Sequence, residues 1–158
     1  MALTDTATST EGLLVAGSVG HGLNDMRILA IHSCDVEGFG LCEQYLIDHE
    51  VDYSVVHPYR DEYLPPAGEF DAILIGGTPM AAYDLRQRQF LQDESAYLQR
   101  ALRLQVPCLG VRFGAQILAM ILGADVRRCA EKEVGTYQVR LTSAGRTGGT
   151  DATARPSA

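Results

Sequence analysis

Short apolar runs alternate with amphipathic stretches through the middle of this chain. Residues 27–32 and 51–57 are rich in β-branched and other apolar side chains, which is typical of buried parallel strands. A third apolar run covers residues 72–75 and follows a loop that contains two prolines. Between the first two runs, residues 39–49 place apolar side chains at helical spacing and predict a helix.

The most regular amphipathic segment covers residues 87–104. Its apolar positions recur at helical spacing, namely Phe90, Leu91, Tyr97, Leu98, Ala101 and Leu102. Its charged positions are expected on an outer, solvated face, namely Arg86, Arg88, Asp93, Glu94, Arg100 and Arg103. An apolar strand at 106–111, an apolar helix up to residue 124, and possible strands at 125–129 and 136–141 follow. This order predicts an α/β fold, a three-layer sandwich with a mainly parallel central sheet and with ligand chemistry at the carboxyl ends of its strands.

The two ends of the chain have a different composition. Residues 1–25 and 143–158 are rich in Thr, Ser, Gly and Ala, which bury too little apolar surface to offset the entropy lost on ordering. We therefore expect a disordered N-terminal extension, a folded domain over 26–142 and a disordered tail. The abrupt change after residue 142 leads us to expect either a domain that is truncated at its C-terminal side or a change of reading frame in the gene.

Charge and cysteine content narrow the classes of function. The chain has 158 residues and a net charge of −7, and its 13 basic residues are spread out, so nucleic acid and anionic membranes are not expected partners. Its four cysteines, Cys34, Cys42, Cys108 and Cys129, form no C-x-x-C pair, and no histidine lies at ligand spacing. We expect no metal, no cofactor and a reducing, cytoplasmic location.

The segment from residue 106 to 124 predicts a strand, a tight turn and a helix, with Arg112 at the turn. In this geometry the first residue after the strand adopts a strained backbone, and its side chain projects over the carboxyl edge of the sheet. The helix that follows directs its N-terminal N–H groups toward the same place. α/β hydrolytic enzymes hold their nucleophile at such turns, although arginine cannot accept an acyl group.

Three segments, which follow one another along the chain at 71–84, 110–116 and 133–142, resemble the class I glutamine amidotransferases, in particular the glutaminase of GMP synthases. Gly110, Gly114 and Gln116 match the family's G-x-C-x-G-x-Q, in which Arg112 stands at the place of the cysteine. Residues 71–84 resemble the family's buried strand with its Gly-Gly turn, and residues 133–142 resemble its E-x-G-x-x-x-V-x-L-T element. The resemblance covers residues 26–142 and implies a flavodoxin-like strand order, with an antiparallel part beginning after the last helix.

The resemblance also implies roles for single residues. Arg112 would occupy the nucleophile position, without being competent there, and Gly77 would supply an oxyanion-hole N–H. Gly76, Gly77, Gln116 and Glu133 would frame the glutamine pocket. The family hydrolyses glutamine through a cysteinyl thioester and passes ammonia to a synthetase partner. That chemistry needs a histidine near the C-terminus, whereas all four histidines precede Arg112, namely His21, His32, His49 and His57.

We therefore expect a glutamine amidotransferase-like protein that is catalytically inactive. The alternative is a non-catalytic module that docks on a synthetase or binds a small anion at Arg112. A third possibility is a related cysteine hydrolase of the same architecture, which the 133–142 element disfavours. Neither Cys108, expected to be buried and inert, nor Cys34, expected to be a surface thiol, is a convincing substitute nucleophile.

Overall fold

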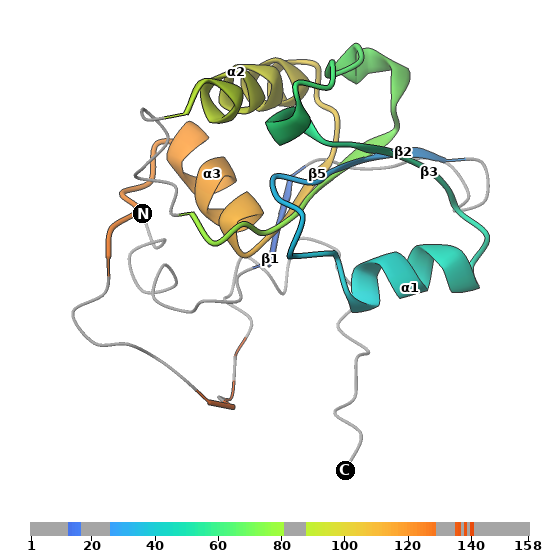
Figure 1. Ribbon diagram of the computed structural model, residues 1–158, viewed down its shortest axis with the longest axis horizontal. Helices are drawn as coiled ribbons and strands as arrows, with labels where there is room; N and C mark the ends of the chain where they lie inside the picture. The colour runs from blue at the N-terminus through green and yellow to red at the C-terminus, as the bar shows by residue number, and fades with distance from the viewer. Residues whose placement is uncertain are drawn as a thin grey trace.

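The computed structural model describes residues 26–80 and 88–128, the backbone of residues 13–16, and residues 135, 136, 138 and 140. Seven helices and strands carry the predicted part of the fold (Figure 1), namely β2 (Arg27–Ile31), α1 (Leu41–Asp48), β3 (Asp52–Val56), β4 (Ala72–Ile75), α2 (Gln89–Arg103), β5 (Cys108–Val111) and α3 (Phe113–Ile121). All seven confirm the elements expected from the sequence, with ends that differ by a few residues. No helix in the described ranges is long and apolar enough to cross a membrane.

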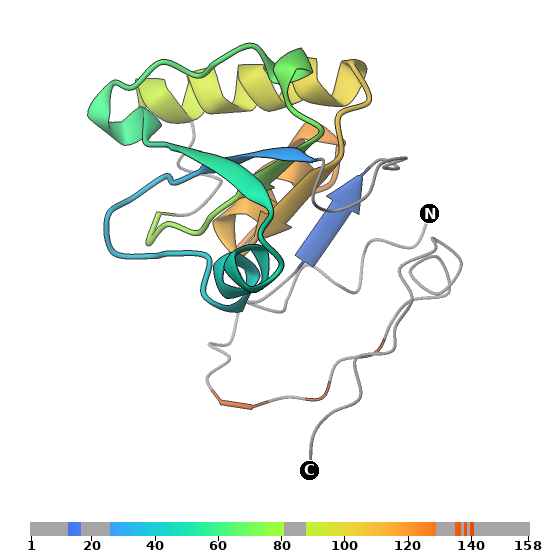
Figure 2. The same cartoon turned by 90° about the vertical axis from the view of Figure 1, so that its right-hand side faces the viewer.

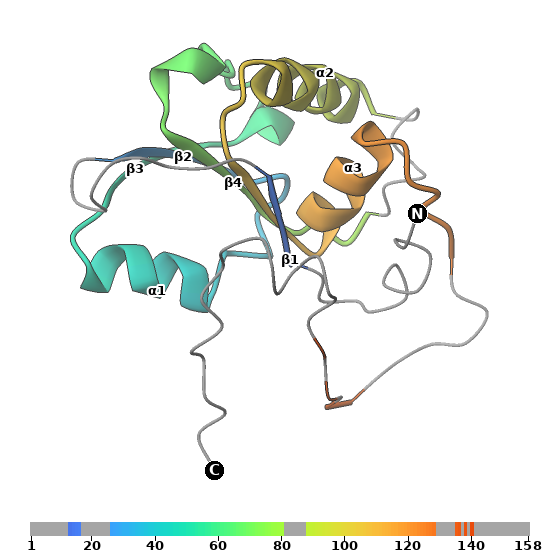
Figure 3. The same cartoon turned by 180° about the vertical axis from the view of Figure 1, so that it is seen from behind.

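The predicted parallel sheet is present. β3, β2, β4 and β5 lie side by side in this order, and every neighbouring pair is parallel. This is the flavodoxin-like order expected from the family resemblance. Helix α1 covers one face of the sheet, and α2 and α3 cover the other, which confirms the three layers (Figures 1 and 3).

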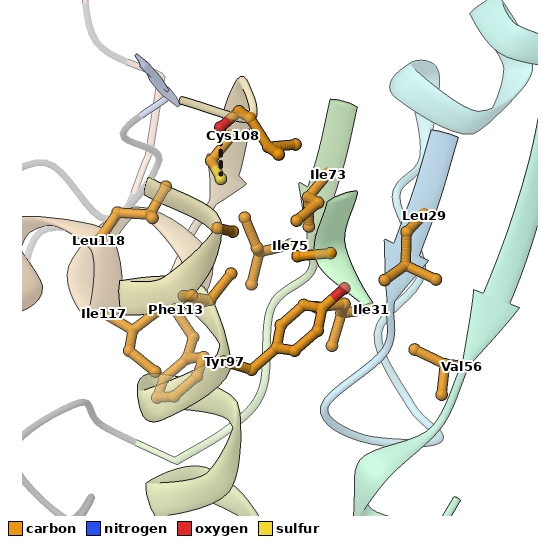
Figure 4. Close-up of a cluster of buried hydrophobic side chains, with 14 of the residues drawn as sticks. Leu29, Ile31, Val56, Ile73, Ile75, Tyr97, Cys108, Phe113, Ile117 and Leu118 are labelled. Carbon is orange, nitrogen blue, oxygen red and sulfur yellow. Dashed lines mark hydrogen bonds between the residues drawn. The ribbon is translucent and has the colours of Figure 1, made fainter. Parts of the chain in front are cut away.

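The sheet separates two apolar cores. The larger lies under α2 and α3 and includes Leu29, Ile31, Ile73 and Ile75 (Figure 4). The smaller lies under α1 and takes Ile28 and Ala30 from the same strand β2. Alternate residues of a strand point to opposite faces, so a central strand covered on both faces must be apolar throughout. This explains the continuous apolar runs in β2 and β4.

Two expectations about the flanking segments need correction. Four residues of the predicted disordered extension form strand β1 (Leu13–Ala16), which pairs antiparallel with β5 at the sheet edge (Figure 2). β1 therefore supplies backbone hydrogen-bond partners to one side of β5. In the expected strands after α3, residues 125–128, 136, 138 and 140 are not in a strand, and most of them are exposed. The other residues of both flanks lie outside the described ranges.

Glu94 is also not where the sequence analysis placed it. It is fully buried on the inner side of α2, because positions 91, 94, 98 and 101 share one helix face. Both of its carboxyl oxygens lie within hydrogen-bond distance of the Ser33 hydroxyl, at 3.0 and 3.1 Å. Burial raises the pKa of Glu94 to about 7, although the Ser33 hydrogen bond acts in the opposite direction. A carboxyl group that keeps its proton can both donate to and accept from that hydroxyl.

This burial predicts how stability depends on pH. The folded chain holds the Glu94 proton up to about pH 7, whereas the unfolded chain releases it near the ordinary value of 4.5. The folded state thus binds more protons in this range, and the free energy of unfolding should fall by about 3 kcal/mol as pH rises through it. Urea unfolding followed by circular dichroism should show this decline in the wild type, and Glu94→Gln should remove it.

The matched control is Asp93→Asn, which removes the neighbouring exposed acid on the same helix and should keep the decline. If the free energy of unfolding changed with pH in the same way in the wild type and in Glu94→Gln, the buried, protonated state of Glu94 would be contradicted.

Candidate functional site

Three loops meet at the carboxyl edge of the parallel sheet. Residues 32–39 follow β2, Gly76 and Gly77 follow β4, and Arg112 follows β5. The Gly76 N–H donates to the Ile31 carbonyl at 3.0 Å, and the Gly114 N–H donates to the Gly76 carbonyl at 3.1 Å. These bonds tie the Gly-Gly turn to β2 on one side and to the first turn of α3 on the other. The three loops are therefore held next to one another at this edge.

The turn at Arg112 has the strained backbone expected from the sequence. Arg112 adopts φ 56° and ψ −111°, a conformation that costs a non-glycine residue about 1–3 kcal/mol. The two flanking glycines are required by close packing. A Cβ on Gly110 would overlap the Gly114 carbonyl group, and a Cβ on Gly114 would overlap the Ile75 carbonyl oxygen. The glycine spacing thus reports how closely α3 approaches β4 and β5.

The Arg112 side chain is half exposed and forms an ion pair with Glu37. Its Nη2 lies 3.4 Å from Glu37 Oε1, and only 15% of the Glu37 side chain is exposed. The Glu37 carboxylate lies directly over Gly77, because a Cβ on that glycine would overlap Glu37 Oε2. An ion pair with one half-exposed partner contributes about 0–1 kcal/mol. Glu37 was not among the residues predicted from the sequence, where its only signal is a place in the loop after the first parallel strand.

The loop that carries Glu37 is anchored by the residues on either side. Cys34 is 8% exposed, and its thiol donates to the Gly77 carbonyl at 3.5 Å, so it is a buried residue and the expectation of a surface thiol is wrong. Phe39 packs on Gly76, where an added Cβ would lie 3.1 Å from the phenyl ring. The rings of Phe39 and His32 also pack edge to face, with their centroids 4.5 Å apart. This loop therefore encloses the Gly-Gly turn.

The three histidines in the described ranges all have polar or aromatic neighbours, and His49 lies at the far end of α1 from the site. Burial lowers the pKa of His32, and the nearby His57 lowers it further. His57 Nδ1 lies 3.2 Å from Glu62, and His49 Nδ1 lies 2.9 Å from the Tyr45 carbonyl. Within residues 26–80 and 88–128, no group of three metal-ligating side chains lies close enough together to hold a metal ion.

The remaining predicted site residues lie in different environments. Gln116 is half-buried on α3, and its N–H donates to the Arg112 carbonyl at 3.2 Å. Cys108 is buried in the larger core, donates to the Val106 carbonyl at 3.4 Å (Figure 4), and has a pKa raised to about 11 by burial. The expected burial of Cys108 is confirmed, and buried thiols with a raised pKa are normally unreactive. Glu133 lies outside the described residues, so its predicted role stays a prediction.

Comparisons with known proteins agree with this architecture. Residues 39–155 match the family described as glutamine amidotransferase class-I. The glutamine amidotransferase-like protein YfeJ of Salmonella typhimurium is 30% identical over 124 residues, which cover 76% of this chain and 52% of YfeJ. One component of the glutamine-hydrolysing GMP synthase of Ignicoccus hospitalis is 34% identical over 95 residues, which cover 59% of this chain and 44% of that component.

Solved structures show the same likeness. A glutamine amidotransferase from Thermotoga maritima has a TM-score of 0.59 and 28% sequence identity, covering 65% of this chain and 44% of that one. The crystal structure of SMU.1228c has a TM-score of 0.65 and 26% identity, covering 81% of this chain and 57% of that one. The chain spans about half the length of the curated relatives that it matches.

The close packing at the turn predicts the effect of adding a methyl group. Gly110→Ala should lower the free energy of unfolding by about 2 kcal/mol or more, because the backbone of Gly114 cannot move aside without displacing α3. The control is Gly68→Ala, whose Cβ would meet only Leu104 at an ordinary 3.9 Å and should change stability by less than about 1 kcal/mol. Equal urea midpoints for the two variants would contradict the close approach.

Proposed function

We propose that this chain, which belongs to the class I glutamine amidotransferase family, does not itself hydrolyse glutamine. The observation that carries the proposal is Arg112 on the strained turn between β5 and α3, at the place where the family motif has its cysteine. Glutamine hydrolysis by this family starts with attack of a thiolate on the side-chain amide. A guanidinium keeps its proton in proteins and offers no lone pair for that attack.

Neither nearby thiol is a good replacement for the missing nucleophile. Cys108 is enclosed in the core, where its raised pKa keeps it protonated near neutral pH. Cys34 lies beside the Gly-Gly turn, but its thiol is buried and donates to the Gly77 carbonyl. Gly76, Gly77, Gln116 and Glu133 would then be the remains of a glutamine pocket, with Gly77 as the oxyanion-hole donor.

The alternative is a non-catalytic module in the cytoplasm that binds a partner or a small anion. One relative is a component of a GMP synthase, so a synthetase is the class of partner to test first. The half-exposed guanidinium of Arg112 favours the anion-binding form of this alternative.

We expect no release of ammonia when the purified chain is incubated with glutamine. A coupled glutamate dehydrogenase assay measures this directly, with an active class I glutamine amidotransferase as the positive control. Ammonia release that is lost after treatment with a thiol-blocking reagent would show that one of the cysteines acts as a nucleophile, and would contradict the proposal.

Replacing Arg112 with cysteine should restore reactivity without restoring turnover. A thiol at the N-terminus of α3 gains acidity from the helix, so Arg112→Cys should be labelled by an electrophilic glutamine analogue. Turnover also requires a base paired with the thiol, and we expect none. The matched control is Arg112→Ser, which should not be labelled. Sustained ammonia production by Arg112→Cys would show that some group of this chain serves as the base, and would contradict this expectation.

A further inference from the structure

The Glu37 carboxylate occupies the centre of the candidate site. One of its oxygens faces the Arg112 guanidinium at 3.4 Å, and the other lies against Gly77. The carboxylate therefore contacts both the guanidinium and the Gly-Gly turn, and an external anion that pairs with Arg112 from this side would compete with it. The site is already occupied by a group of its own chain.

We propose that Glu37 is an intramolecular plug, and that the Arg112–Gly77 site takes up a small external carboxylate only when the Glu37 carboxylate withdraws. The plug and the ligand would compete for the same guanidinium. The plug does not depend on whether the chain hydrolyses glutamine, since it concerns which carboxylate faces Arg112. It rests on the anion-binding form of the alternative function, in which the plug would control when an anion reaches Arg112.

The plug is held weakly enough to be exchanged. Glu37 Oε2 is buried from solvent and has no hydrogen-bond partner. This oxygen therefore loses its hydrogen bonds to water without forming new ones in the protein, which is unfavourable. The other half pairs with a guanidinium that is itself half exposed, and water screens such pairs. An incoming carboxylate that is better oriented can therefore replace it.

The loop around Glu37 permits a local movement. Cys34 and Phe39 are buried anchors, whereas Asp35, Val36 and Gly38 between them are exposed. Withdrawal of the Glu37 side chain thus breaks its ion pair without removing an anchor from the core. The Cys34–Gly77 hydrogen bond and the Phe39 contact with Gly76 can remain in place.

The expected ligand is a carboxylate because the site already holds one. A guanidinium is planar and can pair with both oxygens of a carboxylate, and the Glu37 carboxylate already lies between the Arg112 guanidinium and Gly77. A tetrahedral phosphate shares the charge but not the shape. Acetate and inorganic phosphate are therefore the two probes, because their comparison distinguishes recognition of the planar carboxylate shape from recognition of negative charge alone.

The experiment titrates each probe into the full ¹⁵N-labelled chain at constant ionic strength and follows the amide signals of Gly77 and Arg112. Glu37→Ala removes the plug. Asp35→Ala is the matched control, because it removes the same charge from an exposed position two residues away. Glu37→Gln keeps the size of the side chain but not its charge, and serves if the alanine variant does not fold. Glu37→Ala combined with Arg112→Gln removes the guanidinium as well.

We expect acetate to bind Glu37→Ala about tenfold more tightly than it binds the wild type, as follows if the plug occupies about nine-tenths of the molecules. Glu37→Gln should show a smaller gain, Asp35→Ala should behave as the wild type, and the double variant should lose binding.

Equal acetate affinity in the wild type and in Glu37→Ala, or in Glu37→Gln if that is the variant that folds, would overturn the plug. Binding retained by the double variant, or phosphate bound more tightly than acetate, would overturn the assignment of the ligand. Ammonia release by the wild type would overturn only the proposed lack of activity.

Discussion

The close approach of the β5–α3 turn to strand β4 is the constraint on which the site depends. Gly110 and Gly114 have no room for a side chain, and the Gly114 N–H bonds to the Gly76 carbonyl at 3.1 Å. This contact fixes where α3 begins, which places Arg112 at the sheet edge in a strained backbone conformation. It also fixes the Gly-Gly turn opposite the guanidinium. The geometry of this strained turn is thus fixed by backbone contacts of its neighbours rather than by the side chain at its apex.

The loop after β2 completes the site from the other side. The Ser33 hydroxyl is hydrogen-bonded to the buried Glu94 of α2, and the Cys34 thiol is hydrogen-bonded to the Gly77 carbonyl. These two buried polar contacts connect a helix on one face of the sheet with the turn at its edge. Because an unpaired buried polar group is costly, such contacts favour one position of the loop over others. The loop in turn presents Glu37 to Arg112.

Arg112 and Glu37 place a charged pair at the carboxyl edge of the sheet. The chain belongs to the class I glutamine amidotransferase family, and its strained turn after β5 carries a cationic side chain. A cationic side chain over the sheet edge attracts an anion, and in this structure that anion comes from the chain itself. Function in this fold therefore depends on the residues placed on the turn rather than on the geometry of the turn alone.

The sequence by itself determined the order of strands and helices and the position of Arg112. Buried parallel strands must be apolar on both faces, and the glycine spacing around the turn reflects a contact between residues four positions apart, so both signals are local. Only the tertiary structure decided the pairing of Arg112 with Glu37, since the two residues lie on different loops and meet because the parallel strands end at the same edge. The burial of Glu94 and the pairing of β1 with β5 also depend on partners distant in sequence. Composition could not reveal such partners, because it describes each segment without its neighbours in space.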